Sequence, residues 1–281
     1  MIIDNFALEL YQSCPALYLL RIKRRLVPIR RKAALGFGGA MHAGMAEWYR
    51  THDKVMAVKR IVEVWPQGMP ADDFRTREKC VQTILDYCIE YPDESFKIIG
   101  WPDAPLIEKA FTIDTGMKCE DGEPILYGGI IDLGIDFNTL AYPVEHKSTT
   151  RLGDQWALQF KPNNQVTGYI WALKQLSTMK CNGAMVNGVG IYKASPTKFK
   201  RHLTSRSDTE IQFWLNNVRK VCNDIRRAEA TGEWEWRTRN CTMFGQCDYH
   251  NVHVLGTEVE QEKRISTDYV ISEWNHEERD D

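Results

Sequence analysis

The sequence predicts an α/β protein, in which helices accompany a sheet built around a central hairpin. The first observation is a pair of apolar, β-branched runs, 125–137 and 140–144, which are separated by the short polar break Asn138-Thr139. Such a pair is typical of two antiparallel strands joined by a tight turn. The second observation is that segments with helical periodicity precede and follow the hairpin.

The other elements follow from the same periodicities. Further strands are expected at 97–99 and 107–115, 184–193 and 199–203. Gly38 and Gly39 predict a loop before a helix that starts at Ala40, and Ser13 is a candidate cap for a helical piece with Pro15 in its first turn. The remaining helices are expected at 6–25, 53–65, 72–91, 156–176 with an interruption at Pro162, and 207–231.

The length and composition allow one large domain or two small ones. At 281 residues, 43% hydrophobic and 26% charged, the chain is long enough and apolar enough for a packed core. No apolar run approaches the roughly 18 residues of a membrane-spanning helix, and the N-terminus lacks the pattern of a secretory signal. Its eight cysteines favour reduced thiols or metal ligands over a disulfide framework. A cytoplasmic location is therefore expected.

The charge is distributed unevenly along the chain. Residues 1–32 carry seven Lys/Arg against two Asp/Glu, whereas residues 257–281 carry three against nine. The basic cluster suits contacts with the phosphates of a nucleic acid, and a solvated helix face is an equal alternative. Its candidate contact residues are Arg24, Arg25, Arg30 and Arg31. The acidic tail lacks a periodic apolar pattern and is expected to be partly disordered.

Three charged residues interrupt the apolar hairpin. Asp132 lies in its first strand, and Glu145 and Lys147 close its second. A buried carboxylate costs several kcal/mol unless it is paired or binds a cation. A turn at Asn138 brings Asp132 near Glu145, and two converging carboxylates suit Mg²⁺ or Mn²⁺. A surface salt bridge at the sheet edge is the alternative.

The order of Asp132 and Glu145-His-Lys147 resembles the motif of PD-(D/E)xK nucleases, although Ile131 replaces the proline that is common in the RecB-like branch. Gln165 and Tyr169, four residues apart on one face of a predicted helix, match the Gln-x-x-x-Tyr motif of that branch. His42, near the start of a predicted helix, matches its additional metal ligand, although a histidine on an apolar face is more often a core residue.

Cysteines near both ends extend the resemblance. Cys14 and the pair Cys241 and Cys247 resemble the ligands of an iron–sulfur cluster in related RecB-like nucleases. A fourth cysteine is missing, so His253 or His250 would complete the set, and His253 is preferred. The resemblance implies a [4Fe-4S] cluster, while three thiolates and one imidazole also suit Zn²⁺. A degenerate site that binds no metal is the remaining alternative.

The ordered motifs, from 14 to 253, imply a restriction-endonuclease-like core with a mixed sheet between helices. We expect a single nuclease domain over 1–256, with a helical part at about 36–93, a catalytic sheet at about 96–204 and a helix with a metal-bound cap at 207–256, and an acidic tail at 257–281. In the implied mechanism, a catalytic Lys147 orients or activates the attacking water beside Mg²⁺ or Mn²⁺. The metal ligands would be His42, Asp132, Glu145 and the backbone carbonyl of His146.

The expected function is therefore metal-dependent hydrolysis of DNA, as an exonuclease on single-stranded or end-frayed DNA. Gln165 and Tyr169 would touch the nucleic acid. The resemblance places such an enzyme in recombination, repair or CRISPR and phage DNA processing, in a bacterium or a phage-infected cell, with homo-oligomers or repair proteins as candidate partners. The first alternative is a non-cleaving nucleic-acid-binding protein of the same fold. The second is a structural protein whose only metal is at the cysteines.

Overall fold

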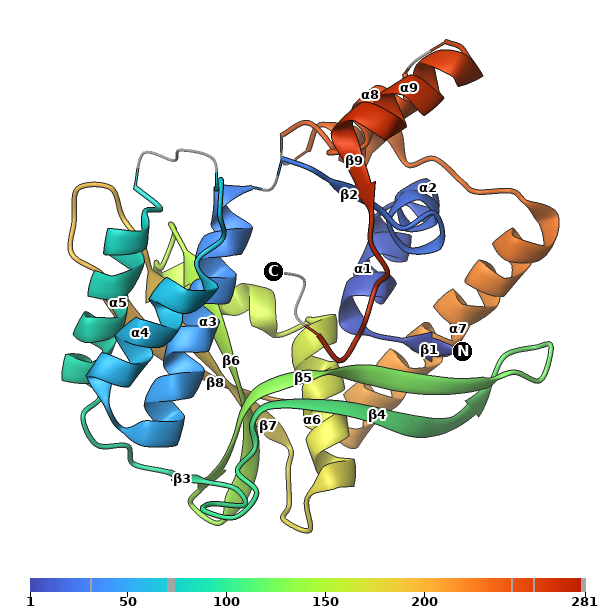
Figure 1. The fold of residues 1–281 in the computed structure, drawn as a ribbon. Coiled ribbons are helices and arrows are strands. Elements are labelled where there is room, and N and C mark those ends of the chain that lie inside the picture. The colour runs from blue at the N-terminus through green and yellow to red at the C-terminus, as the bar shows by residue number, and fades with distance from the viewer. Residues whose placement is uncertain (31, 70–73, 244, 255, 279–281) are drawn as a thin grey trace. The chain divides into compact units, whose positions relative to one another are not determined.

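The computed structural model describes residues 1–30, 32–69, 74–243, 245–254 and 256–278. Its chain divides into two compact units, each assembled from separate segments. The terminal unit contains 1–31, 112–129 and 215–276, and the central unit contains 32–111, 130–214 and 277–281. Two long strands, β4 (Ile107–Lys118) and β5 (Pro124–Phe137), and the long helix α7 (Asp208–Thr231) contribute residues to both units (Figure 1).

The central unit carries the predicted mixed sheet. Besides β5, its strands include β3 (Lys97–Ile98), β6 (Leu140–Thr149), β7 (Gly183–Gly190) and β8 (Lys198–Ser205). β5 pairs antiparallel with β6, with Leu133 opposite Val144, while β6 runs parallel to β7 and β7 antiparallel to β8. The short strand β3 pairs antiparallel with β5. This arrangement confirms the predicted α/β class and its mixed sheet.

Helices accompany this sheet on both sides. Three of them pack together, α3 (Ala33–Thr51), α4 (Lys54–Val64) and α5 (Arg77–Glu90), and α3 also contacts β6 (Figure 1). A 3-10 helix (Asp154–Phe160) and α6 (Asn164–Leu176) follow β6, separated as predicted near Pro162. The core between α3, α5 and the sheet is apolar and fully buried, with Phe37, Met41, Met45, Ile84, Leu133 and Ile135 among its members.

The predicted loop at Gly38 and Gly39 is wrong. Helix α3 already begins at Ala33, so these glycines lie inside it, and His42 lies in its middle rather than in its first turn. Close packing explains two other glycines of this helix. A Cβ at Gly44 would lie 2.7 Å from Ile61 Cγ1 of α4, and one at Gly36 would lie 2.9 Å from Pro66 Cγ. Gly36 and Gly44 therefore allow neighbouring segments to pack closely against α3, and this packing outweighs the low helix propensity of glycine.

The N-terminal segment of the terminal unit is helical. Asp4 caps α1 (Asn5–Ser13) by accepting a hydrogen bond from the Ala7 amide at 2.7 Å. Ser13 is not the predicted cap of the next helix, because its hydroxyl donates to the Leu10 carbonyl and Cys14 occupies the cap position. The elements of this segment are β1 (Ile2–Ile3), α1, α2 (Pro15–Tyr18), a π-helical turn (Leu19–Lys23) and β2 (Leu26–Pro28).

The expected disorder of the acidic tail is also wrong over its described part. Helix α9 (Glu258–Asp268) opens with a capping box between Thr257 and Glu260, and β9 (Tyr269–Ile271) pairs antiparallel with β2. A small core of Leu20, Leu26, Tyr249, Val252 and Tyr269 anchors this segment. Before it lie a 3-10 turn (Thr238–Cys241) and the short helix α8 (His250–His253). None of the helices in the described residues is long and apolar enough to cross a membrane.

Candidate active site

The carboxylates predicted from the hairpin come together inside the central unit. The register that sets Leu133 opposite Val144 places Asp132 and Glu145 one step further along the same strand pair. Asp132 and Glu145 are each only 3% exposed. The backbone amide of His146 donates to Asp132 Oδ2 at 2.7 Å, which fixes the first carboxylate against the second strand. The surface salt bridge considered above therefore does not describe these two groups, because both are buried.

Lys147 lies between Glu145 and the helix that follows the hairpin. Its Nζ is 2.7 Å from Glu145 Oε1 and donates to Gln165 Oε1 at 2.7 Å. Gln165 Nε2 in turn donates to the Tyr169 hydroxyl at 3.3 Å. The motif residues predicted on β6 and α6 are thus in one continuous line of hydrogen bonds. Glu145 and Lys147 share a face of β6, as their spacing predicts.

Glu145 has an environment that suits a cation. Burial raises the pKa of its carboxyl, and the negative charge of Asp132 raises this pKa further, against the lowering effects of Lys147 and His42. Its Oε2 atom is buried and has no hydrogen-bond partner in the part of the chain that the structure describes. A buried carboxylate oxygen without a donor carries a large desolvation cost, which a bound divalent cation would offset.

His42 joins the carboxylates from α3, and it brings a residue that the sequence analysis missed. His42 Nδ1 is 3.3 Å from Asp132 Oδ2 and 3.9 Å from Glu108 Oε1. One ligand atom from each of these three side chains lies within 4.8 Å of the others. Glu108, near the start of β4, has a backbone φ of 47°, in the left-handed region that non-glycine residues seldom adopt. No local sequence pattern predicts this left-handed backbone conformation at Glu108.

The donor set fits a hard divalent ion. The close group offers two carboxylates, Glu108 and Asp132, and the imidazole nitrogen of His42. Glu145, whose carboxyl interacts electrostatically with Asp132 and His42, offers a third carboxylate. Carboxylate oxygens are preferred by Mg²⁺ and Mn²⁺, so these side chains suit the ions expected from the sequence. The unpartnered Oε2 of Glu145 is the observation that supports this fit most directly.

The predicted arginine contacts belong to the terminal unit, where two of them already have acidic partners. Arg24 lies 3.0 Å from Glu262, and Arg25 lies 2.6 Å from Glu273. Arg30 is exposed. Arg31 lies outside the described residues. Arg24, Arg25 and Arg30 are solvent-accessible, as phosphate contacts require, and the first two pair with residues of the acidic tail.

The cysteines of the predicted cluster also belong to the terminal unit. The Cys247 amide donates to the Cys241 carbonyl at 2.8 Å. Burial raises the pKa of the Cys247 thiol, and the neighbouring Cys241 and Cys14 raise it further. His253 stacks on Trp236 with the ring centroids 4.7 Å apart, and burial lowers its pKa. Three thiols therefore lie in one neighbourhood, but among the described residues they do not form a group of ligand atoms as close as that of His42, Glu108 and Asp132.

Comparison with known proteins agrees with this geometry. A scan against protein-family models matches residues 6–252 to the PD-(D/E)XK nuclease superfamily. A solved structure from Eubacterium rectale, described as a candidate exonuclease, superposes with a TM-score of 0.56 at 12% identity, covering 92% of this chain and 89% of that one. The protein SSO0001 covers 79% and 84% at 10% identity, but its TM-score of 0.33 is too low to support an argument. No curated protein sequence matches the chain.

Proposed function

Because this chain belongs to the PD-(D/E)XK nuclease superfamily, we propose that it is a divalent-metal-dependent DNA nuclease of the RecB-like branch. We further propose that it acts as an exonuclease on single-stranded or frayed DNA ends, in recombination, repair or the processing of phage or CRISPR DNA. The observation that carries the proposal is the buried Glu145, which has one oxygen beside Lys147 and the other without a partner in the described chain. If the ion pair with Lys147 were purely structural, the second oxygen would remain buried without a donor, and nothing would offset its desolvation cost.

In this proposal, the side chains of His42, Glu108, Asp132 and Glu145, together with the His146 carbonyl, hold one or two Mg²⁺ or Mn²⁺ ions. A bound ion supplies Lewis acidity to the phosphate and lowers the pKa of water. Lys147 is held between Glu145 and Gln165, where its ammonium group orients the attacking water or stabilises charge on the phosphate. Gln165 and Tyr169 contact the DNA strand beside the scissile bond.

The terminal unit has a supporting role in the proposal. Arg24, Arg25, Arg30 and Arg31 contact backbone phosphates, and Cys14, Cys241, Cys247 and His253 hold a [4Fe-4S] cluster, with Zn²⁺ as the alternative. Burial is the largest cause of the raised pKa of Cys247, and Cys241 and Cys14 are near enough to raise it further, which supports a shared site for these thiols. A brown anaerobic preparation that loses its colour in Cys247→Ser supports iron–sulfur. A colourless protein with stoichiometric zinc supports the alternative, and absence of both metals contradicts a metal site.

Digestion of end-labelled single- and double-stranded DNA with Mg²⁺ or Mn²⁺ tests the function. The wild type should degrade the DNA only when a divalent ion is present, and comparison of 5′ and 3′ labels should give the polarity. Glu145→Ala is the negative control, because it removes the buried carboxylate and leaves the arginines of the terminal unit in place. DNA binding by the wild type without digestion under either ion would support the non-cleaving alternative instead.

A further inference from the structure

A row of polar side chains crosses three strands of the central sheet in register. His146 on β6 is opposite Asn187 on β7, and Asn187 is opposite Arg201 on β8. Asn187 is completely buried, and His146 is 2% exposed. The row lies on the opposite face of β6 from Glu145 and Lys147, because successive side chains of a strand alternate between faces. No residue of this row beyond His146 has a part in the proposed chemistry.

The outer end of the row is a partly buried ion pair between Arg201 and Glu94. Arg201 binds Glu94 through both guanidinium Nη atoms, with each N–O distance 2.6 Å. The guanidinium carbon also lies 3.6 Å from the centre of the Tyr91 ring. The side chains of Arg201 and Glu94 are only 18% and 8% exposed. A bidentate contact of this kind fixes the orientation of the arginine.

Two tyrosines connect the ion pair to Asn187. The Tyr49 hydroxyl donates to Glu94 Oε1 at 2.8 Å, so the 2.6 Å contact between Tyr49 and Tyr87 takes its proton from Tyr87. The Tyr87 oxygen accepts from Arg201 at 3.1 Å and from Asn187 Nδ2 at 2.9 Å. Burial raises the pKa of Tyr87 to about 12, and that of Tyr49 well above its usual value, so both phenols stay protonated. The hydroxyl protons of Tyr87 and Tyr49 therefore both point along this hydrogen-bond network toward Glu94.

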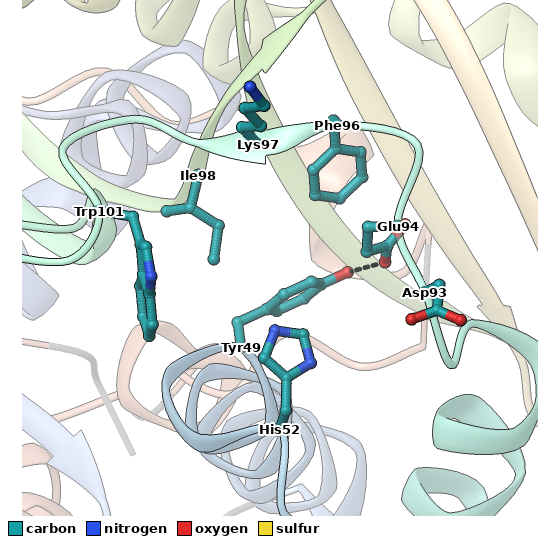
Figure 2. Close-up of a pocket in the computed structure, with 8 residues that line it drawn as sticks. All are labelled: Tyr49, His52, Asp93, Glu94, Phe96, Lys97, Ile98 and Trp101. Carbon is teal, nitrogen blue, oxygen red and sulfur yellow. Dashed lines mark hydrogen bonds between the residues drawn. The ribbon is translucent and has the colours of Figure 1, made fainter.

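Glu94 and Tyr49 also line a cavity of about 330 Å³ (Figure 2). The close-up shows the Tyr49 hydroxyl directed at the Glu94 carboxylate, with Phe96 beside this contact. The cavity is lined by Tyr49, His52, Asp93, Glu94, Phe96, Lys97, Ile98 and Trp101. The Glu94 end of this hydrogen-bond network thus borders open space, whereas its His146 end is enclosed by protein.

The enclosed end of this hydrogen-bond network is His146. Asn187 Nδ2 lies 2.9 Å from His146 Nδ1 and has a second hydrogen for this contact, so Nδ1 accepts and the ring carries its proton on Nε2. The His146 ring stacks on Tyr49 at 6.0 Å and meets His42 edge-on at 5.8 Å. Its backbone amide holds Asp132 at 2.7 Å. Side chain and backbone of one residue therefore face two of the candidate metal ligands.

We propose that Asn187 is a positioning residue for the metal site. In this proposal, the hydrogen-bond network that runs from Glu94 through Arg201 and Tyr87 to Asn187 keeps His146 fixed. A fixed His146 holds Asp132 through its amide and restricts the His42 ring. This inference rests on the proposed function only for the identity of the metal. Hydrogen bonds that orient ligands from outside the coordination sphere commonly change metal affinity by about 10- to 100-fold when they are removed.

Binding of Mn²⁺ to the full chain, followed by the electron paramagnetic resonance signal of the free ion, tests the inference without DNA. Asn187→Leu and Tyr87→Phe should each bind Mn²⁺ about tenfold or more weakly. Tyr87→Phe removes a single oxygen and keeps the ring, so it decides the question if Asn187→Leu does not fold. Thr83→Val is the matched control, because it deletes another buried hydroxyl of α5 that bonds only to Lys79 and Thr197 among the contacts described.

The cleavage assay supplies the second measurement. Both network variants should recover cleavage as Mn²⁺ is raised, with the KM for DNA unchanged, because they alter metal affinity and not DNA contacts. Wild-type Mn²⁺ affinity in both variants, or an equal loss of affinity in Thr83→Val, overturns the positioning role. A wild type that binds Mn²⁺ but does not cleave DNA overturns the nuclease function instead and leaves the positioning role intact.

Discussion

The two units present their candidate sites in opposite ways. In the central unit, the two hairpin carboxylates Asp132 and Glu145 are buried. The partly buried His42 and Lys147 each contact one of them, and Lys147 also bonds to Gln165. In the terminal unit, the predicted arginines that the structure describes are exposed, Arg24 and Arg25 pair with acids of the tail, and the cysteines form a looser neighbourhood. Buried polar groups must satisfy one another, so their arrangement constrains function much more strongly than exposed charges do.

The same contrast holds for single carboxylates. Asp4 in the terminal unit is 5% exposed, nearly as buried as Asp132 and Glu145, but its reason is visible: it caps α1. Glu145 has no such structural task for its second oxygen. A buried acid is therefore informative about function only after its roles in helix capping and ion pairing have been accounted for.

The largest effect is expected at Lys147. Lys147→Ala should lower the rate of DNA cleavage by at least about 100-fold, because it removes the cation beside the buried carboxylate while the ligands for the ion remain. DNA binding, measured by fluorescence anisotropy without a divalent ion, should change little. Lys174→Ala is the control, since Lys174 pairs with the exposed Asp208 in the same unit. Equal cleavage by Lys147→Ala and the wild type would remove Lys147 from the mechanism.

A pH-dependent effect is expected at the capping carboxylate. Burial raises the pKa of Asp4 from 3.8 to about 6, so the stability that this group contributes is present below about pH 4 and is lost as the pH rises through 6. Asp4→Asn keeps the capping oxygen without the charge. It should therefore raise the free energy of unfolding at pH 7 by about 2 kcal/mol and change it little at pH 4. Urea unfolding across this range measures the difference, and a gain that is equal at both pH values would contradict the assigned cause.

The candidate active site and the acidic tail also show which features a sequence can predict. Asp132, Glu145 and Lys147 stand out because they interrupt apolar strands, and their spacing is sufficient to place them on the hairpin. Glu108 does not stand out, since its position depends on a left-handed backbone and on a helix distant in sequence. The start of α3 was missed because Gly38 and Gly39 resemble a loop. The fold of the tail was missed because its acidic composition concealed the capping box at Thr257 and Glu260.

Glu108 allows binding and stability to be separated. Glu108→Gly should weaken Mn²⁺ binding by about tenfold if this carboxylate is a ligand, and glycine should also relieve the positive φ. The relief is expected to raise the free energy of unfolding without metal by about 1 kcal/mol. Isothermal titration with Mn²⁺ and thermal unfolding measure the two effects. Unchanged Mn²⁺ affinity would exclude Glu108 from the metal site, and Glu108→Ala controls for loss of the side chain without relief of the backbone.

The smallest effect is expected at the exposed pairs of the terminal unit. Glu262→Gln and Glu273→Gln release Arg24 and Arg25, and exposed pairs of this kind contribute only about 0 to 1 kcal/mol to stability. DNA affinity should nevertheless rise a few-fold at low salt and return to the wild-type value as the salt concentration increases, because contacts with phosphates are screened. Glu63→Gln, which opens the exposed pair with Lys59 in the central unit, controls for the change in net charge. Equal gains in all three variants would mean that the arginines form a solvated surface and that the tail does not compete with DNA for them.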